Sequence, residues 1–306
     1  MRAIRRILVA VKDPGARSLP AVNKGTQLAR ALGAQLELFH AIDSPYYVDM
    51  LGVTADRTRG FEDEERREYL QRLERVAAGA RLHGARVSVA AEWDYPSYEA
   101  IVRRALATGA DLIVAECHAG RRLAAGLLRL ADWELLRLSP VPVLLVKRTR
   151  PFHRPTLLMA LDPSHAFAKP ARLDQEIIQA GSAVAAALRG KLHAVHACAS
   201  SAAAAAAAAG LEGALRSAGV AAARRHVAAG DPTVVVRDTA RRVGADVVVA
   251  GAVSRSGLKG VFIGNTAERL LDALPCDLLI VKPADFPIAL PRAARGARLQ
   301  AVEPLG

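Results

Sequence analysis

Two stretches of sequence decide the fold: ATGADLIVAE at residues 107–116 and RVGADVVVAG at residues 242–251, which lie 135 positions apart. Each passes from a helical pattern through a glycine into a continuous apolar run, which predicts a helix followed by a buried strand. PVPVLLVK at 140–147 and PCDLLIVKP at 275–283 repeat at the same offset. Two independent blocks at one offset indicate an internal duplication.

The same alternation of short apolar runs and helical patterns extends over the whole of both repeats. In the first repeat we expect five strands and four helices: strands at 7–11, 36–42, 86–91, 111–116 and 142–147, and helices at 17–33, 62–82, 97–108 and 124–138. The second repeat restarts with TLLMALD at 156–162, which matches ILVAVKD at 7–13. Apolar strands separated by helices predict a parallel sheet covered on both faces. The predicted fold class is therefore α/β, with two tandem five-stranded parallel-sheet domains of strand order 3-2-1-4-5.

Helix-forming patterns are clearest at 62–82, where an acidic run at 62–65 is expected to form the first turn. Leu73 and Val76 recur at helical spacing and should face the core. The alanine tract at 202–209 occupies the same slot in the second repeat and predicts a plain helix.

Breaks in these patterns suggest the domain limits. The stretch 149–155 carries two prolines and no periodicity, so it reads as a linker. We predict one domain at 1–150, a second at 151–283, and a C-terminal extension at 284–306 with little regular structure.

Composition excludes several classes of protein. Hydrophobic residues make up 52% of the chain, which excludes disorder over most of it, and aromatic residues are only 4%, too few for base-stacking platforms. The net charge of +12 divides into +6 on each side of residue 150, so no basic arm and no specific nucleic-acid site is expected. Three scattered cysteines fit a reducing cytoplasm rather than a disulfide framework. No apolar stretch approaches the roughly 18 residues of a membrane span.

Ligands of such sheets bind beyond the carboxyl ends of the strands, where the strand order reverses. In the second repeat this point lies between the strands that end at Asp162 and Gly251. The segment after Gly251, GAVSRSGLKGVFIGNTAERLLDAL at 251–274, holds four glycines and then opens a helix. Backbone N–H groups at such a helix N-terminus can receive a phosphate. The chain contains neither a Walker A sequence nor GxGxxG.

This glycine segment, with its GNTAE helix start and final LLIVKP strand, resembles the universal stress protein family. ATP-binding members carry a Gly, two residues, a second Gly, nine residues, and then Gly-Ser or Gly-Thr. Gly251 and Gly264 hold the outer glycine positions, Ser254 replaces the middle one, and Asn265 follows with Thr266 next to it. The segment DWELLR at 132–137 resembles tandem-domain members in particular.

The resemblance implies a Rossmann-like fold of the adenine nucleotide alpha hydrolase type and a cytoplasmic stress-response binding protein. Asp162 falls where the family often places an aspartate that contacts adenosine. The second domain would hold ATP or another small anionic ligand without turnover, with no catalytic residue and no metal site. Its implied contacts are Asp162, Gly251, Ser254, Gly264, Asn265 and Thr266.

The first repeat has lost this pattern, because Glu116, Arg129 and Leu130 stand at the positions of Gly251, Gly264 and Asn265. It would serve assembly, as one half of an intramolecular pseudo-dimer with the final strands near the contact. Two chains could also associate as a homodimer. Alternative functions are an interaction module that binds no nucleotide, a binder of an apolar or acyl ligand, and a slow ATPase or phosphotransferase that uses Asp162.

Three further groups favour structural roles over chemistry. His193 and His196 form an HxxH on a predicted strand, where a spacing of three places them on opposite faces and disfavours a shared metal. Glu116-Cys117-His118 is read as a strand end rather than a metal or thiol site. Trp133 is read as a packing residue.

Overall fold

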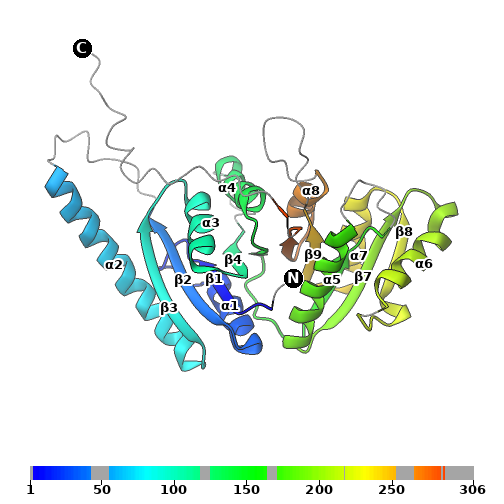
Figure 1. Ribbon diagram of the computed structural model, residues 1–306, viewed down its shortest axis with the longest axis horizontal. Helices are drawn as coiled ribbons and strands as arrows, with labels where there is room; N and C mark the ends of the chain where they lie inside the picture. The colour runs from blue at the N-terminus through cyan, green and yellow to red at the C-terminus, as the bar shows by residue number, and fades with distance from the viewer. Residues whose placement is uncertain are drawn as a thin grey trace, which may run out of the picture.

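Ten strands of the chain join in one continuous sheet, with the order β3-β2-β1-β4-β5-β10-β9-β6-β7-β8 (Figure 1). The computed structural model describes residues 3–42, 55–117, 125–163, 171–216, 218–252, 265–283 and 285–286. β5 and β10 pair antiparallel at the centre, and all other neighbouring strands pair parallel. The strand order 3-2-1-4-5 predicted for each repeat is confirmed on both sides of this central pair.

The first half of the sheet contains the elements that the sequence predicts. They are β1 (Arg6–Ala10), α1 (Pro20–Leu32), β2 (Gln35–Ile42), α2 (Ala55–Leu82), β3 (Arg86–Trp93), α3 (Ser97–Thr108), β4 (Leu112–Glu116), α4 (Ala125–Leu138) and β5 (Val143–Val146). One detail is wrong: α2 begins at Ala55 or earlier, so the acidic run at 62–65 lies inside the helix and not in its first turn. Leu73 is fully buried and Val76 packs against the core, as expected.

The second half repeats the same order of elements. They are β6 (Thr156–Ala160), α5 (Ala171–Ala187), β7 (Lys191–Cys198), α6 (Ala204–Ala214), β8 (Arg225–Ala229), α7 (Pro232–Val243), β9 (Val247–Gly251), α8 (Asn265–Ala273) and β10 (Asp277–Val281), with short 3-10 turns η2 (Ser201–Ala203) and η3 (Ala222–Arg224). The alanine tract is helical, as predicted, in η2 and α6. Of the predicted extension 284–306, only Asp285 and Phe286 fall within the described residues.

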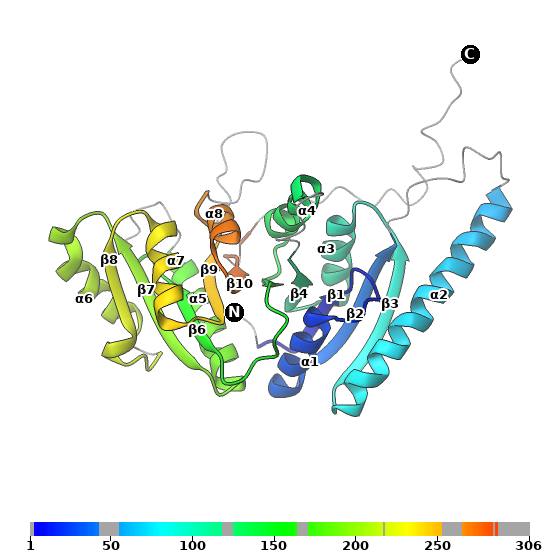
Figure 2. The same ribbon diagram turned by 180° about the vertical axis from the view of Figure 1, so that it is seen from behind.

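Helices cover both faces of the sheet, and each face has its own core. Buried side chains of α1, α2, α5 and α6 share one hydrophobic cluster with the strands, and those of α3, α4, α7 and α8 share the other. α2 and α6 lie at opposite ends of the molecule, while α4 and α8 lie close to its middle (Figure 2). Both cores therefore run through the central β5–β10 pair from one half into the other.

Equivalent backbone hydrogen bonds show that the duplication is structural. The Asp111 N–H donates to the Arg6 carbonyl, and the Asp246 N–H donates to the Thr156 carbonyl, both at 2.8 Å. The two aspartates lie at the offset of 135 that the sequence predicts. The same offset relates two further bonds: the Cys117 N–H donates to the carbonyl of Val146, the last residue of β5, and the Ala252 N–H donates to that of Val281, the last residue of β10.

Helix packing repeats through a matched pair of glycines. Gly25 in α1 lies so close to Val9 that an added Cβ would come within 2.5 Å of it, and Gly181 in α5 meets Met159 at 2.8 Å in the same way. A residue larger than glycine would overlap the stiff Val9 side chain at position 25, and would require the flexible Met159 side chain to shift at position 181. Because Gly25 and Gly181 are equivalent, Lys24 and Ala180, which precede them, are equivalent too.

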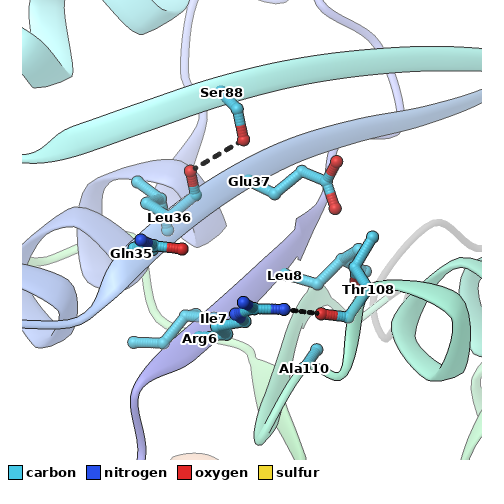
Figure 3. A pocket seen from close by; sticks show the side chains of 9 residues that line it. All are labelled: Arg6, Ile7, Leu8, Gln35, Leu36, Glu37, Ser88, Thr108 and Ala110. Atoms are coloured by element: carbon cyan, nitrogen blue, oxygen red, sulfur yellow. Dashed lines mark hydrogen bonds between the residues drawn. The ribbon is translucent and has the colours of Figure 1, made fainter.

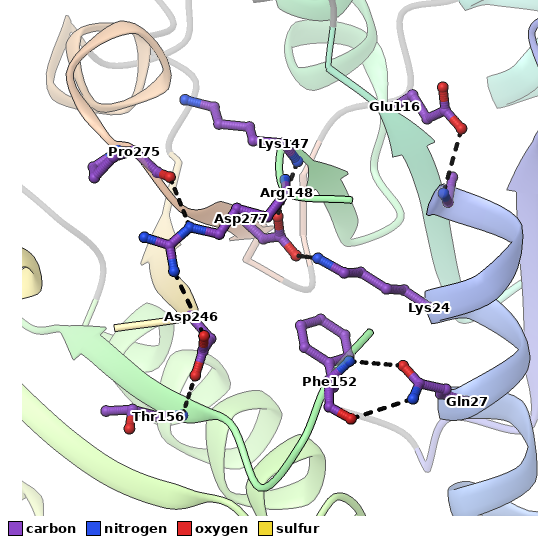
Figure 4. A network of polar contacts seen from close by, with 11 residues as sticks. Lys24, Gln27, Glu116, Lys147, Arg148, Phe152, Thr156, Asp246, Pro275 and Asp277 are labelled. Atoms are coloured by element: carbon purple, nitrogen blue, oxygen red, sulfur yellow. Dashed lines mark hydrogen bonds and ion pairs between the residues drawn. The ribbon is translucent and has the colours of Figure 1, made fainter. Parts of the chain in front are cut away.

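The junction between the halves contains a buried ion pair. The Lys24 Nζ in α1 lies 2.5 Å from Oδ2 of Asp277 at the start of β10, and both side chains are at most 2% exposed (Figure 4). The other carboxylate oxygen of Asp277 accepts the N–H groups of Lys147 and Arg148, at 2.9 and 3.0 Å. Asp277 therefore receives three hydrogen bonds from the chain that leaves β5 and from the first helix.

The segment between β5 and β6 is also bound to α1. Gln27 accepts the Phe152 N–H through Oε1 at 2.9 Å and donates from Nε2 to the Phe152 carbonyl at 3.2 Å. The ring of Phe152 lies 4.6 Å from the Lys24 Nζ. This connection thus shields the ion pair and positions the second half against the first.

Two equivalent lysines that follow the central strands differ in their partners. Lys147, after β5, donates from Nζ to the carbonyls of Leu271 and Leu274 at the end of α8. Lys282, after β10, is only 4% exposed, and its Nζ has no hydrogen-bond partner among the described residues, although it lies 4.0 Å from the ring centroid of Phe286. Burial lowers the pKa of Lys282 to about 7.

Removal of the Asp277 carboxylate should be strongly destabilising. We expect Asp277→Ala to lower the free energy of unfolding by about 3–5 kcal/mol, because it leaves the buried Lys24 ammonium uncompensated. Urea denaturation measures the change. The double variant Lys24→Met, Asp277→Asn removes both charges and should recover much of the loss. A loss below about 1 kcal/mol in the single variant would contradict this role.

Lys282→Met should instead stabilise the protein near neutral pH, on the order of 2 kcal/mol, because the folded state then no longer buries an unpartnered amine. The folded-state pKa of Lys282 is about 7 and the ordinary value is 10.5, so only the unfolded state stays protonated between these pH values. The gain is therefore full below pH 7 and fades as the pH rises toward 10.5. Denaturation at several pH values tests this.

Lys147→Met is the matched control for the Lys282 prediction. It should destabilise by about 1–3 kcal/mol, because the carbonyls of Leu271 and Leu274 lose their donor. If both substitutions changed the free energy of unfolding in the same direction, the distinction between the two lysines would be contradicted.

Candidate functional site

The predicted ligand position lies at the carboxyl ends of two neighbouring strands. Asp162 follows β6 after one residue, and Gly251 is the last residue of β9. β6 pairs with β9 on one side and with β7 on the other, so the strand order reverses here. The fold therefore brings Asp162 and Gly251 to adjacent strand ends at the position where sheets of this type bind ligands.

Asp162 stands in a polar setting built by α5 and β7. Its backbone N–H faces the carboxylate of Asp174, with the two oxygens 3.2 and 3.1 Å away, and Asp174 is itself buried in the first turn of α5. His196 on β7 is 2% exposed, and its Nδ1 lies 3.0 Å from the Leu161 carbonyl and 4.0 Å from Oδ1 of Asp162. Two carboxylates and one imidazole thus meet at the end of β6.

Gly251 has a packing reason to be glycine. A Cβ at this position would lie 2.6 Å from a Leu173 methyl group and 3.1 Å from Ile177. Both residues belong to α5 and are fully buried. The absent side chain therefore lets α5 approach the end of β9, independently of any ligand.

The remaining predicted contacts are described only in part. Ser254 and Gly264 lie outside the described residues. Asn265 and Thr266 are the first described residues of α8, and their backbone is described while their side chains are not. Burial raises the pKa of Glu268, which lies in the first turn of α8. The described part of α8 thus follows the glycine segment in the chain.

The equivalent position in the first half is built differently. The Val11 N–H donates to the Phe39 carbonyl, and the Leu161 N–H donates to the Val195 carbonyl in the same way, so Val11 and Leu161 are equivalent. Lys12, and not Asp13, is therefore the counterpart of Asp162. The sequence match of 7–13 with 156–162 is therefore displaced by one residue here. Glu116, the counterpart of Gly251, accepts the Ala21 N–H in the first turn of α1 at 3.4 Å (Figure 4).

A carboxylate thus occupies the start of α1 in the first half. Its negative charge lies at the strand end equivalent to Gly251 and would repel an anionic ligand there. That the first half does not hold a nucleotide stays a prediction.

A separate small pocket opens at the amino ends of β1, β2 and β3, lined by Arg6, Glu37, Ser88 and Thr108 among others (Figure 3). Its volume is about 120 Å³, and Arg6 donates across it to the Thr108 carbonyl. Pockets for drug-sized ligands measure about 300–1,000 Å³. This pocket is too small for a nucleotide, and it lies at the opposite edge of the sheet from the predicted site.

Other residues singled out in the sequence have structural surroundings. His193 and His196 occupy opposite faces of β7, as their spacing predicts: one bonds His226 on β8 and the other bonds Leu161 after β6. Cys117 donates its N–H to the Val146 carbonyl, while His118 lies outside the described residues. Among the residues whose placement is described, no group of three or more His, Cys, Asp and Glu could hold a metal ion.

Trp133 packs against the core on the α3–α4 face, which agrees with the structural role expected for it. Within the described ranges, no helix is both long enough and apolar enough to cross a bilayer.

Sequence reasoning missed Asp174 and the role of His196. The sequence does hold a signal for the role of His196, because the repeated segments QLELFHA and KLHAVHA both end in a His-Ala pair. His40 on β2 bonds the Val11 carbonyl at 2.8 Å, as His196 bonds Leu161. Each half thus uses a buried histidine to bond the carbonyl of the residue that follows β1 or β6, and in the second half the carboxylates of Asp162 and Asp174 lie beside it.

Comparison with known families gives a match over both halves. The model of the Universal stress protein family matches residues 3–147 and 173–282. Universal stress protein E of Escherichia coli K12 is 25% identical, covering 93% of this chain and 96% of that protein. Universal stress protein E homolog of Haemophilus influenzae is 29% identical over 63% of this chain and 68% of its own.

Solved structures agree with this match along nearly the whole chain. A protein of unknown function from Pseudomonas aeruginosa PAO1 is 27% identical with a TM-score of 0.74, over 92% of this chain and 94% of that one. A putative universal stress protein from Pseudomonas aeruginosa UCBPP-PA14 is 28% identical with a TM-score of 0.73, over 92% and 95%.

Substitution at Gly251 tests its packing role. We expect Gly251→Ala to lower the free energy of unfolding by about 1–3 kcal/mol, because the new methyl group overlaps Leu173. Gly79→Ala is a matched control, since its Cβ on α2 would meet nothing within 4 Å and alanine favours helix. Thermal unfolding of both variants measures the difference. Equal melting temperatures would contradict the close contact between α5 and β9.

Proposed function

Because the chain belongs to the universal stress protein family, we propose that it is a stress-response binding protein whose second half holds a small anionic ligand, with ATP as the first candidate. The observation that carries the proposal is the difference between equivalent strand ends. The second half presents Asp162 and Gly251 at adjacent strand ends, whereas the first half places Glu116 at the start of α1.

The chemistry of the second half divides the ligand into two parts. The carboxylate of Asp162 is an acceptor suited to hydroxyl or amino groups, such as those of a nucleoside. The N–H groups at the start of α8, reached through Gly264, Asn265 and Thr266, suit a phosphate, because the helix dipole favours negative charge there. Ser254 supplies a hydroxyl where a glycine would expose the backbone. The ligand would lie across the ends of β6 and β9.

We further propose that the protein binds its ligand in the cytoplasm and does not convert it chemically. A hydrolytic reaction needs a positioned general base or a metal, and no such group is part of the proposal. The first half acts in assembly through the central strand pair. Association of two chains into a homodimer stays a prediction.

One observation favours the alternative of an interaction module or an apolar-ligand binder. The Asp162 N–H already faces the Asp174 carboxylate, which adds a second negative charge close to the site. An anion must therefore bind on the α8 side of Asp162 and away from α5.

Calorimetric titration with ATP and Mg²⁺ at low salt tests the proposal. We expect one nucleotide per chain with micromolar affinity, about −8 kcal/mol. Asp162→Ala should weaken binding about tenfold or more, because the nucleoside loses its acceptor, which corresponds to at least about 1.4 kcal/mol. Lys12→Ala, at the equivalent position of the first half, is the matched control and should bind as the unchanged protein does.

Absence of binding heat at two temperatures, with folding confirmed by circular dichroism, would overturn the nucleotide proposal. Mass spectrometry of the purified protein then decides between the alternatives. A co-purified acyl compound would support an apolar ligand. Two nucleotides per chain would contradict the assembly role of the first half.

A further inference from the structure

His193 and His226 form a hydrogen-bonded pair on the outer strands of the second half. Nδ1 of His193 on β7 lies 3.0 Å from Nε2 of His226 on β8. The ring planes differ by only 4°, with centroids 5.4 Å apart. Both side chains lie on the α7 face of the sheet and are half-buried. The pair sits near the amino ends of its strands, at the opposite end of the sheet from Asp162.

Arg242 fixes the direction of the hydrogen bonds. Its Nη2 lies 3.5 Å from Nδ1 of His226 and 3.5 Å from the Thr239 hydroxyl. A guanidinium only donates, so Nδ1 of His226 accepts, and the neutral ring carries its proton on Nε2. That Nε2–H donates to Nδ1 of His193, which leaves the His193 proton on its own Nε2. The chain Arg242–His226–His193 therefore ends in an N–H donor for which no described residue is an acceptor.

Cations surround the histidine pair. Burial lowers the pKa of both imidazoles, and the nearby charges lower it further: Arg224 and Lys191 for His193, and Arg242 for His226. These side chains come from η3, β7 and α7, which are the elements around the pair. The acidic Glu212 of α6 pairs with Arg225, which also donates to the Val220 carbonyl. Both contacts of Arg225 lie on the face of β8 opposite the histidine pair. The potential at the pair is therefore positive.

A positive potential decides between the two ligands that paired histidines could take. A metal cation would approach three fixed positive charges, which repel it. An anion would gain from all three charges and from the terminal N–H of His193. Arginine matches phosphate oxygens with its planar fork, and two arginines with a lysine and an imidazole are typical partners of a phosphate group.

We propose that His193 and His226, together with Arg224, Arg242 and Lys191, bind a phosphate group at a second site, independent of the ligand proposed at Asp162. Arg224, Arg242 and Lys191 are exposed, so a phosphate can reach them from solvent. A bound anion stabilises protonated imidazole, so phosphate binding raises the pKa of both histidines. By linkage, affinity for phosphate then increases as the pH falls below neutrality.

Proton NMR of the histidine rings in the full chain tests the site, with inorganic pyrophosphate as the probe. We expect pyrophosphate to raise the pKa of His193 and His226 by about one unit. His83, which is exposed on the α2 side of the first half, should not change. No change at His193 and His226 at millimolar pyrophosphate would overturn the proposal.

Variants separate this site from general attraction to a basic protein. Arg242→Gln and His193→Gln should each weaken pyrophosphate binding about tenfold. Arg30→Gln, an exposed arginine at the end of α1, is the matched control and should bind as the unchanged protein does. Equal losses in Arg30→Gln and Arg242→Gln would overturn the proposal.

Two further probes identify the source of the phosphate and exclude a metal. A short single-stranded RNA that binds with steep salt dependence, and is lost in Arg242→Gln, would assign the phosphate to a polymer backbone. Binding of pyrophosphate without RNA binding would assign it to a small ligand. Zinc binding that needs His193, and that Arg242→Gln strengthens, would overturn the proposal in favour of a metal site.

Discussion

The buried carboxylate of Asp277 is the contact on which the arrangement of the two halves depends. It receives the ammonium of Lys24 from one helix and two backbone N–H groups from the chain that leaves β5. β10 can pair antiparallel with β5 in a fixed register because these groups meet at its first residue. A single sheet then spans the molecule, and both hydrophobic cores continue across it.

Much of this fold could be predicted because it rests on local periodicity. Apolar runs specify the strands, and the offset of 135 between blocks specifies the duplication, while the antiparallel pairing of β5 with β10 is seen only in the structure. Lys24 could not be predicted as buried, because a lone lysine in a helical pattern resembles a solvent-exposed residue. Its partner lies 253 positions away, at a distance in sequence where no periodicity connects them. The start of α2 was missed for a related reason, since its charged residues show no apolar stripe.

Only the part of the candidate site that follows from strand order could be predicted from the sequence. Strand order alone brings Asp162 and Gly251 to adjacent strand ends. The contact of Gly251 with Leu173 depends on how α5 packs, which strand order does not determine. The one-residue displacement between Lys12 and Asp13 depends on the ends of the ladders. Likewise, the spacing of His193 and His196 predicts that they lie on opposite faces of β7. Only the pairing of β7 with β8 shows that His226 is the partner of His193.

The ion pair at the junction has no copy on the other side of the pseudo-twofold axis, and this asymmetry selects partners. At the equivalent positions stand Ala180 and Pro142, neither of which carries a charge. Two second halves brought together would leave each Asp277 facing an alanine, and two first halves would leave each Lys24 facing a proline. Both mismatches bury a charge without a counter-ion, which costs several kcal/mol. Each half therefore recognises the other in preference to a copy of itself, which disfavours pairing of two like halves from different chains.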